Sequence, residues 1–119
     1  MPRARGGVVT HRRHKKVLEL TKGHKATRHA LYRRAHESML HALHYAYCHR
    51  RERKGDMRRL WIIRINAAAR AGGLSYSQFT DGLRKANVAI NRKTLAEMAV
   101  NDPSSFSKLL TLASDELKS

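Results

Sequence analysis

The chain has 119 residues, of which 25 are Lys or Arg and 9 are Asp or Glu, so its formal net charge is +16. That length leaves room for one domain plus an extension, and no apolar run approaches the roughly 18 residues of a membrane helix. The single cysteine, Cys48, excludes an internal disulfide and gives no sign of an oxidising compartment. The basic start has no apolar stretch behind it, so we expect no secretory signal. We expect a cytoplasmic protein, or one of an organelle that makes its own proteins.

The charge is concentrated in the first half of the sequence. Residues 1–59 contain 17 Lys and Arg against 4 Asp and Glu, whereas residues 60–119 contain 8 against 5. All eight histidines also lie in the first half. Charge on one end indicates a basic arm for a polyanionic partner, attached to a more ordinary domain. We therefore expect a basic arm over 1–59 and a small globular domain over 60–119. Nucleic acid is the commonest such partner, because each neutralised phosphate releases counterions.

The basic half begins with a predicted tail and a short helix. Residues 1–8 contain proline, glycines and arginines and predict an extended, flexible tail. Thr10 is the expected N-cap of a helix over about 11–21, and Gly23 supplies the left-handed residue that ends it.

A second, long helix is expected to follow. It starts near Thr27 and meets no proline before Gly72, with Gly55 as its only internal weak point. The segment 50–59, with the sequence RRERKGDMRR, has almost no apolar face. We expect this segment to be helical only when a partner neutralises its charge, so the free arm should be largely disordered.

The second half predicts three short helices, each marked by a capping residue. Their starts are Ser75 or Ser77, then Asn91, then Asp102 followed by Pro103. The expected inward-facing residues are Tyr76, Phe79, Gly82, Leu83, Ala86, Leu95, Met98, Ala99, Phe106, Leu109, Leu110 and Ala113. No stretch alternates apolar and polar residues. The expected fold class is therefore all-α, with a long basic N-terminal helical extension followed by a small C-terminal helical globular domain.

The sequence gives little support for catalysis or metal binding. His11 with His14, and His41 with His44, are each spaced to share a helix face. No cysteine pair or nearby acidic ligand completes a tetrahedral metal set around them. The alternative is that the histidines lie beside phosphates and add hydrogen bonds. No phosphate-binding glycine motif and no nucleophile with a base can be named. We expect no enzyme activity, no cofactor and no metal.

Two kinds of nucleic-acid binding remain. The helices over 76–86 and 91–100 resemble a helix-turn-helix in outline, but the second offers only Arg92 and Lys93 for reading bases. A DNA-binding helical regulator or nucleoid protein is therefore the alternative function. In the arm, Lys and Arg recur on all sides of the helix, whereas a helix on a duplex or membrane needs one basic face. Charge on every side indicates a rod between RNA helices and no membrane partner.

The basic side chains are the expected RNA contacts, because arginine binds phosphates with two hydrogen bonds and lysine binds them as a point charge. Arg64 and Arg70 are expected to join them at the junction with the domain. The predicted RNA-binding residues are Arg3, Arg5, Arg12, Arg13, His14, Lys15, Lys16, Lys22, Lys25, Arg28, Arg33, Arg34, Arg50, Arg51, Arg53, Lys54, Arg58, Arg59, Arg64 and Arg70.

Several stretches resemble one known family. They are RRHKKVL at 12–18, HRRERK at 49–54, RRLWIIRINAAAR at 58–70 and GLSYS at 73–77. With them, essentially the whole chain is similar to the bacterial large-subunit ribosomal protein numbered twenty. One departure lies at 24–26, where the family usually has aromatic residues and a glycine and this chain has His-Lys-Ala.

The resemblance implies a function that composition does not show. Members of the family bind large-subunit ribosomal RNA, contact neighbouring ribosomal proteins and act early in assembly of that subunit. Their N-terminal helix penetrates the RNA, their C-terminal domain lies nearer the surface, and they are not required for peptide-bond chemistry. In some bacteria the protein also represses translation of its own operon by binding the messenger RNA through the C-terminal domain.

Overall fold

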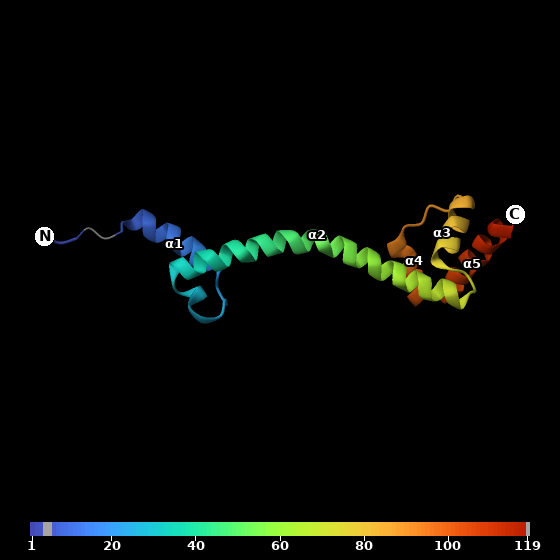
Figure 1. The fold of residues 1–119 in the computed structure, drawn as a ribbon, viewed down its shortest axis with the longest axis horizontal. Coiled ribbons are helices and arrows are strands. Elements are labelled where there is room, and N and C mark those ends of the chain that lie inside the picture. Colours follow the sequence, from blue (N-terminus) through green and yellow to red (C-terminus); the bar gives the residue numbers. More distant parts are fainter. Residues whose placement is uncertain (4–5, 119) are drawn as a thin grey trace. The chain divides into compact units, whose positions relative to one another are not determined.

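Every regular element of the chain is a helix in the part that the structure, a computed structural model, describes, namely residues 1–3 and 6–118. The expected all-α fold class is therefore confirmed for these residues. Packing divides the chain into two compact units, Met1–Arg51 and Glu52–Ser119. The elements are α1 (Val8–Leu20), the 3₁₀ helix η1 (Ala26–His29), α2 (Tyr32–Ala71), α3 (Tyr76–Lys85), α4 (Arg92–Asn101) and α5 (Pro103–Lys118) (Figure 1).

Helix α1 begins earlier than the sequence pattern predicts. Its N-cap is Gly7, whose backbone is extended and which makes no side-chain capping bond. Thr10 lies inside the first turn, so the capping role predicted for it is wrong. The physical reason is that glycine is nearly as favourable as threonine at the N-cap position. Starting the helix after Gly7 therefore adds almost one turn with little loss of capping free energy. The predicted left-handed glycine after the helix is confirmed, because Gly23 has φ +83°.

The long helix begins later than predicted, at Tyr32 and not near Thr27. Contacts that α1 and the loop after it make with the start of α2 explain the shift, since the chain must turn back for them to form (Figure 1). The ring of His14 stacks on that of Tyr32 at 3.7 Å. The Nδ1 atom of His24 lies 2.7 Å from the hydroxyl oxygen of Ser38. These contacts are specified by residues far apart in sequence, so helical periodicity alone could not reveal the break.

Helix α2 has 40 residues and is helical through Gly55. Residues 50–60 are all exposed, so packing within the protein gives this part of the helix little support. The expectation that it depends on RNA for its helicity therefore stays a prediction. The boundary expected between the basic arm and the domain, between residues 59 and 60, was placed where the density of charge falls, and it also stays a prediction.

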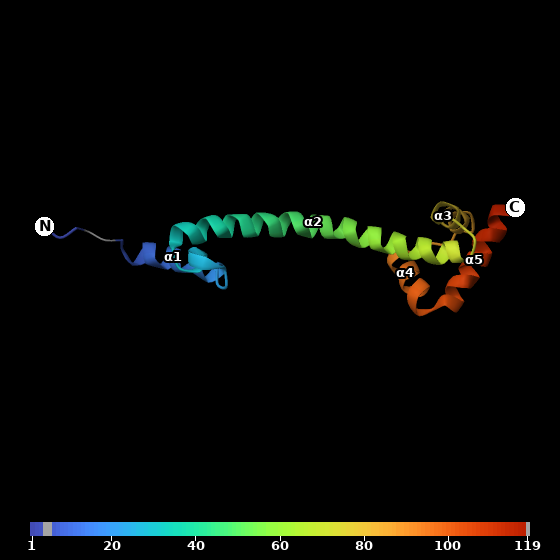
Figure 2. The same ribbon diagram turned by 60° about the horizontal axis from the view of Figure 1, so that its bottom comes forward.

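The core of the second unit forms where α3, α4 and α5 gather around the C-terminal end of α2 (Figure 2). Phe79 and Phe106 pack there with their ring centroids 5.1 Å apart. Of the residues expected to face inward, Ala86 is only half-buried and lies outside the core cluster. The buried members of that cluster are Ile65, Ala69, Phe79, Leu83, Leu95, Ala96, Phe106 and Ala113.

The capping signals of the second half are confirmed. Ser75 forms a reciprocal capping box with Gln78 at the start of α3. The side chains of Asn91 and Asp102 each accept a hydrogen bond from the backbone N–H three residues ahead, at 2.8 and 3.1 Å. Asn87, which follows α3, has φ +56°, the left-handed conformation in which many helices end. Local chemistry therefore fixes where these short helices begin and end.

Candidate nucleic-acid interface

The predicted RNA-binding side chains lie on the surface. Nineteen of the twenty fall within the described part of the chain, and Arg5 lies outside it. Of the nineteen, only His14 is not exposed, because its ring is half-buried against Tyr32. Long, exposed cationic side chains can reach phosphates without disturbing the helices that carry them.

Most of this positive charge is not neutralised within the protein. Among the predicted residues that the structure describes, only two form ion pairs: Arg34 with Glu37 at 3.8 Å and Arg59 with Asp56 at 3.5 Å. Both pairs are exposed, and such pairs typically contribute at most about 1 kcal/mol. The unit Met1–Arg51 contains 13 Lys and Arg against 2 Glu, with no Asp. Its charge is therefore available to an external polyanion.

Histidines and tyrosines form a row of stacked rings on α2. Tyr45 lies between His41, at 6.3 Å, and His49, at 5.8 Å, with interplanar angles of 24° and 15°. The guanidinium of Arg51 lies 4.7 Å from the centre of the Tyr47 ring. Both tyrosines are about half exposed. Exposed rings next to cationic side chains are typical of surfaces that stack unpaired bases.

The structure does not assemble a metal site from these histidines. No group of three or more His, Cys, Asp or Glu side chains in the described residues could hold a metal ion. His44 instead lies 3.7 Å from the sulfur of Cys48, one helical turn ahead. None of the helices in the same part of the chain is long and apolar enough to cross a membrane.

The outline of a helix-turn-helix in α3 and α4 does not present a base-reading surface. The Nε atom of Arg92 donates a hydrogen bond to the hydroxyl of Tyr76 at 2.9 Å, which ties α4 to α3. Leu95 and Ala96 of α4 are buried in the core. The would-be recognition helix therefore packs within the domain, as core helices do, and leaves few side chains for a groove.

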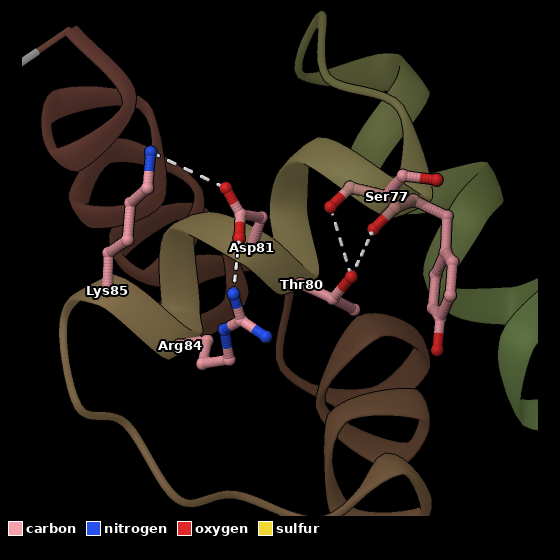
Figure 3. A network of polar contacts seen from close by, with 6 residues as sticks. Ser77, Thr80, Asp81, Arg84 and Lys85 are labelled. Carbon is pink, nitrogen blue, oxygen red and sulfur yellow. Dashed lines mark hydrogen bonds and ion pairs between the residues drawn. The ribbon is translucent and has the colours of Figure 1, made fainter.

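The exposed basic residues of α3 are also partly neutralised. Figure 3 shows Asp81 between Arg84 and Lys85, and both cations lie 3.5 Å from its carboxylate oxygens. Thr80, one residue earlier, turns its hydroxyl back to the helix backbone, where it donates to the carbonyl of Ser77 at 3.1 Å (Figure 3). This face is therefore less attractive to phosphates than the arm.

Two hollows on the surface were not predicted from the sequence. In the second unit, Lys93 shares a hollow of about 400 Å³ with Trp61 and Arg64. In the first unit, a hollow beside Arg28 includes Tyr45, which is not among the predicted RNA-binding residues. The hollow in the first unit joins residues of η1 and α2, and the hollow in the second unit joins residues of α2 and α4, so neither follows from the spacing along a single helix.

Comparison with known proteins identifies the family. The model of the family described as Ribosomal protein L20 matches residues 3–109. The chain belongs to this family. It is 61% identical over 113 residues to the large ribosomal subunit protein bL20 of Dehalococcoides mccartyi, covering 95% of each chain. It is 53% identical over 117 residues to the bL20 protein of Moorella thermoacetica, covering 98% of this chain and 97% of the relative. The resemblance stated from the sequence is thus confirmed.

Proposed function

We propose that the protein is a structural constituent of the large ribosomal subunit, located in the cytoplasm, and that it binds large-subunit ribosomal RNA directly. The proposal rests on family membership over nearly the whole chain and on one physical observation. The first unit has 13 Lys and Arg against 2 Glu in its sequence, and among its described residues only Arg34 forms an ion pair, with Glu37. Ribosomal RNA supplies the phosphates that such a surface needs. The role is structural and not enzymatic.

The basic arm, residues 1–59, is the proposed RNA-contacting element, and residues 60–119 form the domain that anchors it. The arm neutralises phosphates where RNA helices crowd together and so reduces the repulsion that opposes compaction. Its predicted contacts are on several faces of α1 and α2 and are nearly all exposed. An element surrounded by RNA uses such an arrangement, whereas a membrane-surface helix does not.

Three finer roles complete the proposal. The protein acts early in assembly of the large subunit, because charge neutralisation is needed before RNA helices can pack closely. It contacts neighbouring ribosomal proteins. It also represses translation of its own operon by binding the messenger RNA through the C-terminal domain, where Arg64 and Lys93 border a surface hollow.

The salt dependence of RNA binding tests the central proposal. For each phosphate contact, log K should fall by about 0.7–0.9 per unit of log salt concentration. Replacing Arg50, Arg51 and Arg53 together by glutamine should reduce this slope by about 2–3 in the full-length protein bound to large-subunit ribosomal RNA. The matched control replaces Arg84 and Lys85, which Asp81 partly neutralises, and should change the slope less. An affinity that does not depend on salt would contradict the proposal.

A further inference from the structure

A polar hollow of about 400 Å³ lies on the first unit between η1 and the face of α2 that carries the stacked rings. One of its lining residues belongs to η1, and the others recur along α2 at helical spacing. They are Arg28 on η1, and Arg34, Glu37, Ser38, His41 and Tyr45 on α2. All six belong to the compact unit Met1–Arg51, so the hollow does not depend on how the two units are placed.

The carboxylate of Glu37 is the unexpected member of this set. It is one of only two acidic groups in a unit with 13 Lys and Arg. A carboxylate repels the phosphates that the surrounding cations attract. Its ion pair with Arg34, at 3.8 Å with both side chains more than 60% exposed, is too long and too solvated to add much stability. Phosphate binding alone therefore does not explain its place in the hollow.

The other walls of the hollow match the needs of an unpaired base. Tyr45 is 55% exposed, and its ring is held by the stacked rings of His41 and His49. The hydroxyl of Ser38 is fixed by the ring of His24 at 2.7 Å. Arg28 and Arg34 supply cations at the rim. Aromatic rings stack bases, arginines bind the adjoining phosphates, and a carboxylate accepts hydrogen bonds from base N–H groups.

We propose that this hollow receives an unpaired guanine of the bound RNA, with Glu37 accepting hydrogen bonds from its N1–H and N2–H groups and Tyr45 stacking against its ring. Guanine is the base whose Watson–Crick edge offers two adjacent donors, which match the two oxygens of a carboxylate. Adenine, cytosine and uracil each offer one donor group on that edge. The proposal rests on the proposed RNA-binding function and adds base recognition to a surface otherwise expected to contact only phosphates.

The substitution Glu37→Gln separates the two accounts by the sign of its effect. If the arm contacts only phosphates, removing a negative charge should strengthen RNA binding. If Glu37 binds guanine, the substitution should weaken binding to RNA with an unpaired guanine by about tenfold, the effect of losing a two-bond base contact. Glu19→Gln is the matched control, because Glu19 is the other acidic residue of the unit, is exposed and lies outside the hollow. It should not weaken binding in either account.

The full-length protein is tested against a pool of hairpin RNAs with randomised single-stranded loops. The wild type and the Glu19→Gln variant should enrich loops with guanine, whereas Glu37→Gln and Tyr45→Ala should lose that preference. Tyr45→Phe should keep it, because stacking needs the ring and not the hydroxyl. Circular dichroism checks that each variant keeps its helical content.

The outcomes distinguish this proposal from the function on which it rests. Binding of the pool without guanine enrichment, or the same enrichment in Glu37→Gln, overturns guanine recognition and leaves RNA binding intact. Absence of any binding overturns both. Binding of free 5′-GMP without guanine enrichment in the pool assigns the hollow to a mononucleotide and likewise overturns the proposal.

Discussion

The close approach of α3 and α5 at Gly82 predicts that Gly82→Ala destabilises the second unit. A Cβ atom at position 82 would lie 2.5 Å from the carbonyl oxygen of Ala113 and 2.8 Å from its Cα and Cβ atoms. Two of these three are backbone atoms, so α5 would have to move away from α3 by about 1 Å to restore ordinary contact distances. Such overpacking typically costs about 1–3 kcal/mol.

A better helix propensity opposes this effect but does not cancel it. Alanine is more favourable than glycine inside a helix by about 1 kcal/mol. Because the clash is with backbone atoms of Ala113, we expect the upper part of the overpacking range, about 2–3 kcal/mol, and therefore a net destabilisation of about 1–2 kcal/mol. For a domain of this size, that lowers the melting temperature by roughly 5–15 °C, measured by thermal unfolding followed through circular dichroism.

The matched control is Gly55→Ala, where a Cβ would meet nothing within 4 Å. Gly55 is also inside α2 and meets no steric obstacle, so this substitution should not lower the melting temperature. A melting temperature of Gly82→Ala equal to or above that of the wild type would refute the reasoning, because α3 and α5 would then not approach so closely.

Three further predictions concern a cap, a backbone strain and the arm. Hydrogen bonds from Ser104, then Ser105, lower the pKa of Asp102 from 3.8 to about 2. The contribution of the ionised Asp102 to the free energy of unfolding is therefore present above pH 4 and is lost as the pH falls toward 2. Asp102→Asn should flatten this part of the pH profile, measured by urea unfolding. Ala26 has φ +58°, a conformation that disfavours a Cβ by about 1–2 kcal/mol, so Ala26→Gly should slow amide hydrogen exchange in η1; faster exchange would contradict this. A peptide of residues 1–59 should be largely disordered alone and gain helix with ribosomal RNA, and full helicity without RNA, seen by circular dichroism, would defeat that expectation.

The second half of the fold could be predicted because its signals are local. Each of these helices begins at a residue whose side-chain oxygen accepts a hydrogen bond from a backbone N–H three residues ahead: Ser75, Asn91 and Asp102. Such capping residues can be recognised in the sequence from their type and position. Ala86 was wrongly placed in the core because periodicity gives the face of a helix but not how far its neighbours extend along it.

The first half was harder because contacts between distant residues decide it. The start of α2 at Tyr32 follows from the stacking of His14 on Tyr32 and from the contact of His24 with Ser38. Nothing in the local sequence specifies those pairs. The candidate RNA surface was predictable from charge, since unpaired cations are exposed wherever they occur. The hollow beside Arg28 was not, because it depends on where η1 lies beside α2.

The association of the protein with the large ribosomal subunit tests the central claim most directly. Lysate from cells with a tagged copy is separated on a sucrose gradient, with one sample first washed in high salt to remove loosely bound basic proteins. We predict co-sedimentation with the large subunit that survives the wash. A peak only in soluble or DNA-associated fractions, with none on the large subunit, would contradict the account and favour a DNA-binding protein.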